Sequence, residues 1–209
     1  MSIIKSLNWR YATKKFDSSK LLSEEKLSIL KEAFNLTALS YGLQTLKMIV
    51  VNDKIIREKL VDISFGQRQV VDASHLLILC TQKEIDAEDV DSHFDTIKSI
   101  RNTPDHILKP FRADLHTTIK EMPKTKKADW AAKQAYIALG NLMTVCAVEE
   151  IDSCPMEGFI PEELDGILSL DDLGLESVLL LPVGYRAEDD FFATLKKVRK
   201  PLEETVISF

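Results

Sequence analysis

Residue patterns that would hold a metal ion or a disulfide framework are absent from this sequence. Cys80, Cys146 and Cys154 form no C-x-x-C pair, and apolar residues lie beside each of them. We therefore expect three buried, reduced thiols. The four histidines show no H-E-x-x-H spacing and no other close grouping, so the sequence predicts no metal site.

Long apolar runs are absent as well. The longest, such as LLLPV at 179–183, are far shorter than the roughly 20 residues that a membrane-spanning helix needs. The first residues, MSIIKSLNWR, lack the apolar core and the small-residue cleavage site of a signal peptide. With 209 residues, 45% of them hydrophobic, the chain suits one globular domain in the cytoplasm, without a membrane partner.

The apolar pattern predicts helices and strands that do not alternate regularly. A helix is expected over 22–39, with Ser23 as its N-cap. The other expected elements are strands at 46–52, 74–82 and 177–186 and helices at 53–64, 128–150 and 161–168. Residues 84–127 predict short helices and mobile connections. No G-x-G-x-x-G follows a strand, so the order favours an α+β domain over a dinucleotide-binding Rossmann domain.

Two expectations concern single segments. The Ala- and Leu-rich helix at 128–150 is apolar on nearly all sides, which is typical of a central buried helix. Residues 201–209, PLEETVISF, read as an extended tail with apolar residues of its own. A tail of this kind needs a surface on which to lie.

Positive charge is scarce overall and concentrated at the two ends of the chain. Lys and Arg number 27 against 33 Asp and Glu, for a net charge of −6. Residues 1–15 and 196–200 nevertheless carry four basic residues each and no acidic one. The acidic remainder would repel a nucleic acid over most of the surface. Each cluster alone is typical of a solvated patch, but the two together predict a site for one small anion.

Five motifs occur in a fixed order along nearly the whole chain. They are R-x-x-T-K-x-F at 10–16, D-A-S-H-L-L-I-L at 72–79, W-x-x-K-Q-x-Y-x-x-x-G-N at 130–141, P-M-E-G-F at 155–159 and K-x-R-x-P at 197–201. With these motifs the sequence resembles the FMN-dependent NAD(P)H nitroreductases and flavin reductases. The resemblance implies a nitroreductase-like mixed sheet wrapped by helices. It also implies one FMN-binding domain over 1–200 and a C-terminal arm, 201–209, exchanged between the subunits of a homodimer.

The resemblance also explains the basic ends of the chain. It implies that Arg10, Lys197 and Arg199 converge on the FMN phosphate, whose oxygens suit the planar fork of arginine. Lys14 would lie at the pyrimidine edge and favour the reduced flavin, while Glu157 and Gly158 would pack along the ring near N5. No side chain is expected to act as a catalyst itself. The full set of implied FMN contacts is Arg10, Tyr11, Ala12, Lys14, Ser40, Gly42, Gln44, Gln67, Gln69, Pro155, Met156, Glu157, Gly158, Lys197 and Arg199.

Three segments depart from the family pattern. Well-known members carry Asn and Lys before D-A-S-H, where this chain has Gly66 and Gln69, and the amide of Gln67 or Gln69 could replace those contacts to the flavin ring. In the family, the loop after the first long helix reaches the partner's flavin. In this chain the loop keeps Ser40 and Gln44 but lacks the family's Asn, Pro and Trp. Near the phosphate, Tyr11 adds an aromatic ring, and Ala12 stands where the family more usually has Ser, so a hydroxyl donor is missing. A changed substrate pocket is therefore expected.

The implied function is that of an enzyme. FMN would pass hydride from NADH or NADPH, through N5, to a nitroaromatic, quinone or flavin acceptor in a ping-pong sequence. One alternative is an FMN-storage or sensing protein with little turnover. Another is an α+β interaction protein without flavin, whose basic ends bind an acidic partner.

Overall fold

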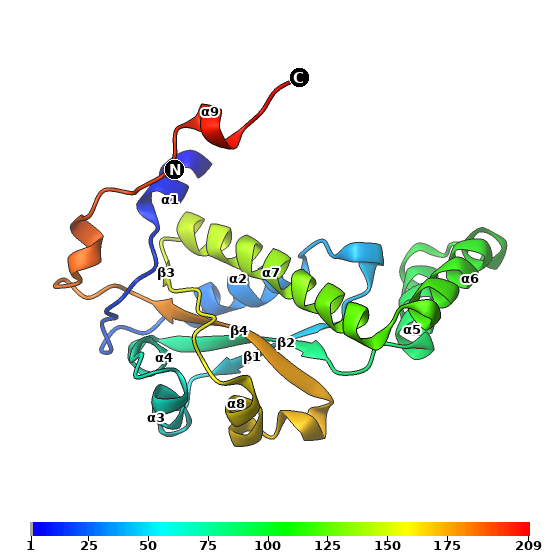
Figure 1. Cartoon of the computed structure of the whole chain (residues 1–209), viewed down its shortest axis with the longest axis horizontal. Coiled ribbons are helices and arrows are strands. Elements are labelled where there is room, and N and C mark those ends of the chain that lie inside the picture. Colours follow the sequence, from blue (N-terminus) through cyan, green and yellow to red (C-terminus); the bar gives the residue numbers. More distant parts are fainter. Residues whose placement is uncertain (1) are drawn as a thin grey trace.

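Four strands form a single sheet at the centre of the molecule, and helices cover both of its faces (Figure 1). The computed structural model describes residues 2–209. The strands are β1 (Leu46–Val51), β2 (His75–Gln82), β3 (Asp152–Ser153) and β4 (Leu175–Gly184). The helices are α1 (Ile3–Trp9), α2 (Glu24–Asn35), α3 (Lys54–Ile63), α4 (Gln69–Asp72), α5 (Ala87–Arg101), α6 (Asp105–Glu121), α7 (Lys124–Val148), α8 (Pro161–Leu168) and α9 (Leu202–Thr205). Short 3₁₀ turns are η1 (Ser40–Gly42), η2 (Leu170–Leu173) and η3 (Phe191–Thr194).

The sheet has the order β1-β2-β4-β3, and its strands pair antiparallel. Ile78 of β2 lies opposite Ile49 of β1 and Leu180 of β4, so β2 is central and buried, as its continuous apolar run predicts. In residues 2–209 the parallel component of the expected mixed sheet is one isolated bridge, between Ala12 and Ser153. That bridge connects the N-terminal segment to the sheet edge.

The alternating side chains of β2 divide the core into two layers. Leu76 and Ile78 pack on one face, in the cluster completed by α3, α4 and α8. Leu77 and Leu79 point to the other face and pack under α2 and α7. Figure 1 shows α7 crossing one face and α3, α4 and α8 on the opposite one. The three cysteines are buried and free, which confirms the expected reduced thiols.

The expectation of short helices and mobile connections over 84–127 is wrong. The segment forms two long helices, α5 and α6, which project from the end of the molecule opposite α1 (Figure 1). A capping box of Asp86 and Asp89 starts α5. Pro104 and Pro123 stand just before α6 and α7, where a missing N–H costs no helical hydrogen bond. These prolines mark helix starts rather than breaks in structure.

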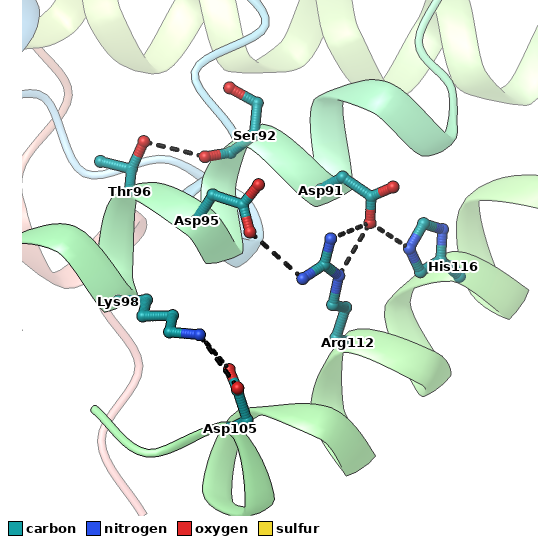
Figure 2. Close-up of polar contacts among 8 residues, drawn as sticks. All are labelled: Asp91, Ser92, Asp95, Thr96, Lys98, Asp105, Arg112 and His116. Carbon is teal, nitrogen blue, oxygen red and sulfur yellow. Dashed lines mark hydrogen bonds and ion pairs between the residues drawn. The ribbon is translucent and has the colours of Figure 1, made fainter. Parts of the chain in front are cut away.

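A network of charged side chains fastens α6 to α5 (Figure 2). The carboxylate of Asp91 accepts hydrogen bonds from Nε of Arg112 (2.8 Å) and Nε2 of His116 (2.7 Å). Arg112 also contacts Asp95, and Lys98 pairs with Asp105 near the turn. The paired residues lie 7 to 25 positions apart in the sequence, so no local sequence pattern predicts these contacts.

The long helix α7 is not buried on all sides, contrary to expectation. One face, with Ala135, Ala138 and Leu142, packs on the sheet. Tyr136 and Ile137 on the other face are each 48% exposed. The helix is apolar on two faces, and only the face that packs on the sheet is covered within this chain. In residues 2–209 no helix has the length and apolarity needed to cross a membrane.

The C-terminal tail is only partly extended. Residues Leu202–Thr205 form the single turn α9, favoured by Pro201 at its start and by Glu203 and Glu204 in its first turn. The apolar side chains of the tail remain exposed, among them Ile207 at 78%. The tail therefore finds no apolar surface of its own chain to cover it.

Candidate functional site

The two basic ends of the chain meet around one cavity of about 460 Å³. Figure 1 shows α1 and the C-terminal segment at the same end of the molecule. The cavity is lined by Asn8, Trp9, Arg10, Tyr11, Ala12, Lys14, Phe192, Ala193, Leu195, Lys196, Lys197, Val198 and Arg199. The structure thus brings together six of the residues expected to bind the cofactor, from both sequence clusters.

Three cations in this cavity repel one another. Burial lowers the pKa of Arg10, and the neighbouring charge of Arg199 lowers it further. Burial also lowers the pKa of Lys197, with additional contributions from Arg10 and Arg199. Across residues 2–209 no carboxylate forms an ion pair with any of the three. The Nε atom of Arg10 is buried without a hydrogen-bond partner, so a bound anion would supply both the missing acceptor and the missing negative charge.

A buried carboxylate shapes the loop that carries Arg10 and Lys14. Asp190 accepts hydrogen bonds from the Tyr11 hydroxyl (2.9 Å) and from the backbone N–H groups of Lys14 (3.0 Å) and Lys15 (3.1 Å). Burial alone would raise the pKa of Asp190, but these hydrogen bonds outweigh it and the pKa is lowered. The side chain of Lys14 stays exposed at the cavity. Sequence reasoning missed Asp190; its only local signal is an acidic residue that caps the turn η3.

A second carboxylate fastens the same loop from behind. Asp152 is 4% exposed and accepts from the backbone N–H and from Nε of Arg186, both at 2.8 Å. The guanidinium of Arg186 lies 4.3 Å from the ring centre of Trp9 and 4.6 Å from that of Tyr11. These contacts also escaped sequence reasoning, because Asp152 and Arg186 are 34 positions apart. The ring and hydroxyl of Tyr11 are thereby committed to Arg186 and Asp190.

From the cavity a second group of expected residues continues along the sheet edge. Ala12 bridges to Ser153, and the chain then runs through Pro155 and Met156 to the turn at 157–158. Met156 pairs with Leu180 of β4. This adjoining segment, residues 153–158, forms a continuous border that leads away from the cationic cavity.

The turn at Glu157 and Gly158 is held by two side chains. The Tyr136 hydroxyl of α7 donates to the carboxylate of Glu157. The side-chain amide of Gln67 donates to the carbonyl oxygen of Gly158 at 3.0 Å, and a Cβ on Gly158 would lie 2.9 Å from that amide nitrogen. A larger residue at 158 would therefore displace the end of the Gln67 side chain and weaken this hydrogen bond. Gln69 lies buried at the start of α4.

The third expected group lies apart from the cavity. The N–H of Ser40 donates to Oε1 of Gln134 at 2.9 Å, and the Gln44 amide donates to the carbonyl oxygen of Asn35 at 3.1 Å. Gln134 is in the N-terminal half of α7, whereas Arg10 lies near Cys146 at the other end. Twelve residues of helix separate these positions by about 18 Å. Within one chain, Ser40, Gly42 and Gln44 do not join the cationic cavity.

Comparison with known sequences gives matches over most of the chain. Residues 7–185 match the family model described as "Nitroreductase family". The oxygen-insensitive NAD(P)H nitroreductase of Salmonella typhimurium is 30% identical over 221 residues, which cover 99% of each protein. These matches include both the cationic loop at 10–15 and the 153–158 segment.

Comparison with solved structures confirms the expected α+β, nitroreductase-like fold. The crystal structure of ydfN from Bacillus subtilis superposes with a TM-score of 0.87 at 24% identity, covering 99% of this chain and 98% of that one. A protein from Exiguobacterium sibiricum, crystallised in complex with FMN, gives a TM-score of 0.83 at 18% identity, with 100% and 98% covered.

Proposed function

Because the chain belongs to the nitroreductase family, we propose that it is an FMN-dependent oxidoreductase that takes reducing equivalents from NADH or NADPH. The observation that carries this proposal is the cationic cavity, in which Arg10 has a buried, unpartnered Nε beside Lys197 and Arg199. A phosphate monoester fits this set, since it brings two negative charges and several acceptor oxygens.

Each part of the site has a proposed task. Arg10, Lys197 and Arg199 bind the phosphate, and Lys14 places a cation beside the cofactor. The 153–158 segment borders the ring system, with Glu157 and Gly158 at its far end. When bound, FMN supplies the two-electron hydride chemistry that no side chain of the protein can provide. Donor and acceptor use the same open site in turn, and the acceptor is a nitroaromatic, a quinone or a free flavin.

A homodimer would complete this site. The exposed face of α7, with Tyr136 and Ile137, and the exposed tail both lack a cover within one chain. Ser40 lies about 18 Å along α7 from the cavity. We propose that a second copy covers these apolar surfaces and brings its 40–44 loop to the flavin of the first, while the tail, 201–209, lies on the partner.

The visible spectrum of the purified protein tests the proposal. Protein incubated with FMN and then desalted should keep a yellow flavin band, and anaerobic NADH or NADPH should bleach it. The double variant Arg10→Ala/Arg199→Ala should lose the band on desalting. The control Arg68→Ala/Arg101→Ala, which removes the same charge from exposed positions, should keep it.

Other results would support the alternatives. A band that resists both nucleotides would favour flavin storage or sensing over catalysis. Wild-type protein that retains no flavin would contradict the phosphate site and, with it, the proposed activity. Retention by the Arg10→Ala/Arg199→Ala variant equal to that of wild type would place the flavin elsewhere.

A further inference from the structure

We propose that Arg186 is a positioning residue for phosphate binding: it fixes Trp9 and Tyr11 and thereby directs Arg10, which lies between them, into the cationic cavity. This inference rests on the proposed function, since it assigns a role in binding the phosphate of FMN. Trp9, Tyr11, Arg186 and Asp152 together are called the Arg186 clamp below.

Arg186 is held by two aromatic rings and a carboxylate, and it is not a ligand of the cavity. Its guanidinium contacts two aromatic rings, at 4.3 Å and 4.6 Å from their centres, and the carboxylate of Asp152. It does not line the cavity. A cation between two rings and a buried carboxylate is well stabilised, and the planar guanidinium can face both rings as a lysine ammonium cannot.

The clamp determines the direction of Arg10 through the backbone. Arg10 follows the last residue of α1 in an extended conformation, with φ −70° and ψ 144°. Its two neighbours in the chain, Trp9 and Tyr11, both contact Arg186, so the backbone is held on either side of Arg10. Because both flanking rings are held on Arg186, the backbone of Arg10 is fixed, and its side chain lines the cavity together with Lys197 and Arg199.

The clamp also keeps charges separate. Asp152 is the buried carboxylate on this loop's inner side, and it also accepts a hydrogen bond from the Thr13 hydroxyl. Its charge is used by Arg186, which leaves Arg10 free of any carboxylate within residues 2–209. Without Arg186, the loop would lose its anchor and a buried negative charge would be left unpaired behind an anion site. Both changes weaken phosphate binding and leave the ring contacts of the flavin in place.

Comparing FMN with riboflavin isolates this effect, because riboflavin lacks only the phosphate. We would titrate each flavin with the full-length protein and follow the quenching of flavin fluorescence. Wild type should bind FMN more tightly than riboflavin. Arg186→Met should reduce that preference about tenfold, the value for one misdirected charge-assisted hydrogen bond. Its riboflavin affinity should stay unchanged, Arg186→Lys should recover part of the preference, and Arg68→Met should keep all of it.

The outcomes separate this inference from the proposed function. Wild type without any preference for FMN would overturn the phosphate site itself, and the role of Arg186 with it. A wild-type preference that survives in a folded Arg186→Met protein, or equal weakening of both flavins, would overturn the positioning role alone. If Arg186→Met does not fold, Arg186→Lys decides, since it keeps the charge beside Asp152 but cannot face both rings: a reduced preference supports the role, and an unchanged one overturns it.

Discussion

Asp190 illustrates how one residue can organise a loop made of cations. Its carboxylate accepts from the Tyr11 hydroxyl and from the backbone N–H groups of Lys14, Lys15 and Phe192. Because the Asp190 carboxylate binds Tyr11 and backbone N–H groups, the side chains of Lys14 and Lys15 stay free to contact other partners. A carboxylate in this position adds negative charge near the site and still favours anion binding, because it directs cationic side chains outward.

The charge of Asp190 should make the stability of the protein pH-dependent. Its pKa lies below the ordinary value of 3.8, so its contribution is complete above that value and is lost as the pH falls through the lowered pKa. Asp190→Asn should reduce the free energy of unfolding at pH 7 by about 1–2 kcal/mol, as expected for weakened hydrogen bonds to a charged acceptor.

Urea unfolding of wild type and Asp190→Asn at pH 7, 5 and 3 measures this prediction. The difference between them should be equal at pH 7 and 5 and should shrink at pH 3. Asp189→Asn is the control, because that exposed neighbour only pairs with Lys15 at the surface and should change little. A difference that remains constant down to pH 3 would contradict a role for the charge.

At the residue scale, part of the site could be predicted from sequence. Arg10, Lys197 and Arg199 stand in dense basic clusters, which local counting detects. Asp190 and Arg186 could not be recognised, because their partners lie 176 and 34 positions away and because single Asp and Arg residues are common on surfaces. Their importance arises only when the chain is folded.

At the element scale, α5 and α6 depend on each other more than on the sheet. Their interface contains the Asp91–Arg112–His116 network (Figure 2). It also contains an apolar contact, in which the rings of Phe94 and Phe111 meet edge to face at 5.4 Å. The pKa of Asp91 is lowered, first by Arg112 and then by His116. The carboxylate of Asp91 thus accepts hydrogen bonds from two residues of α6, Arg112 and His116.

Replacing Asp91 should loosen α6 without affecting the sheet. Asp91→Ala removes the shared acceptor, and Arg112 keeps only Asp95. Amide hydrogen exchange measured by mass spectrometry should become faster in 105–121 and stay unchanged in β2. Asp105→Ala, which breaks only the exposed pair with Lys98, should have little effect. Faster exchange throughout the protein would show instead that Asp91 supports global stability.

The elements that could be predicted are those whose sequences carry a local signal. The strands at 46–52, 74–82 and 177–186 have continuous apolar runs, and each overlaps an observed strand. The α5–α6 pair was not predicted, because the segment is mostly polar and its prolines indicated breaks, whereas Pro104 stands just before α6 and Pro110 lies inside it. For α7 the composition could not say which of its two apolar faces the chain itself would cover.

At the scale of the whole molecule, the distribution of charge and of apolar surface points beyond one chain. The net charge is −6, yet both ends are basic and meet at one cavity. Apolar surface is left uncovered on α7 and along the tail. Sequence alone predicted the meeting of the ends and the need of the tail for a surface. It could not place Ser40 about 18 Å from the cavity, since that depends on the course of α7.

Removing the tail should therefore weaken the proposed dimer. A chain that ends at Lys200 keeps Lys197 and Arg199 but loses the exposed apolar residues Leu202, Ile207 and Phe209. Burying such side chains contributes about 1.5–3 kcal/mol each, so the dimer dissociation constant should rise by at least about tenfold. Sedimentation velocity over a concentration series measures this constant. Glu203→Gln/Glu204→Gln, which alters the tail but keeps its apolar residues, is the control and should leave the constant unchanged.

The same truncated chain links assembly to the flavin site. If the 40–44 loop reaches the cavity from a second copy, FMN affinity should fall only at concentrations where the truncated chain is monomeric, because its own phosphate ligands are intact. Flavin fluorescence titrations at protein concentrations above and below the dimer dissociation constant compare the FMN affinity of the dimer with that of the monomer. An FMN affinity that does not depend on assembly would mean that one chain binds the cofactor by itself. A wild-type protein that is monomeric at all concentrations would contradict the proposal that a second copy covers the exposed apolar face of α7.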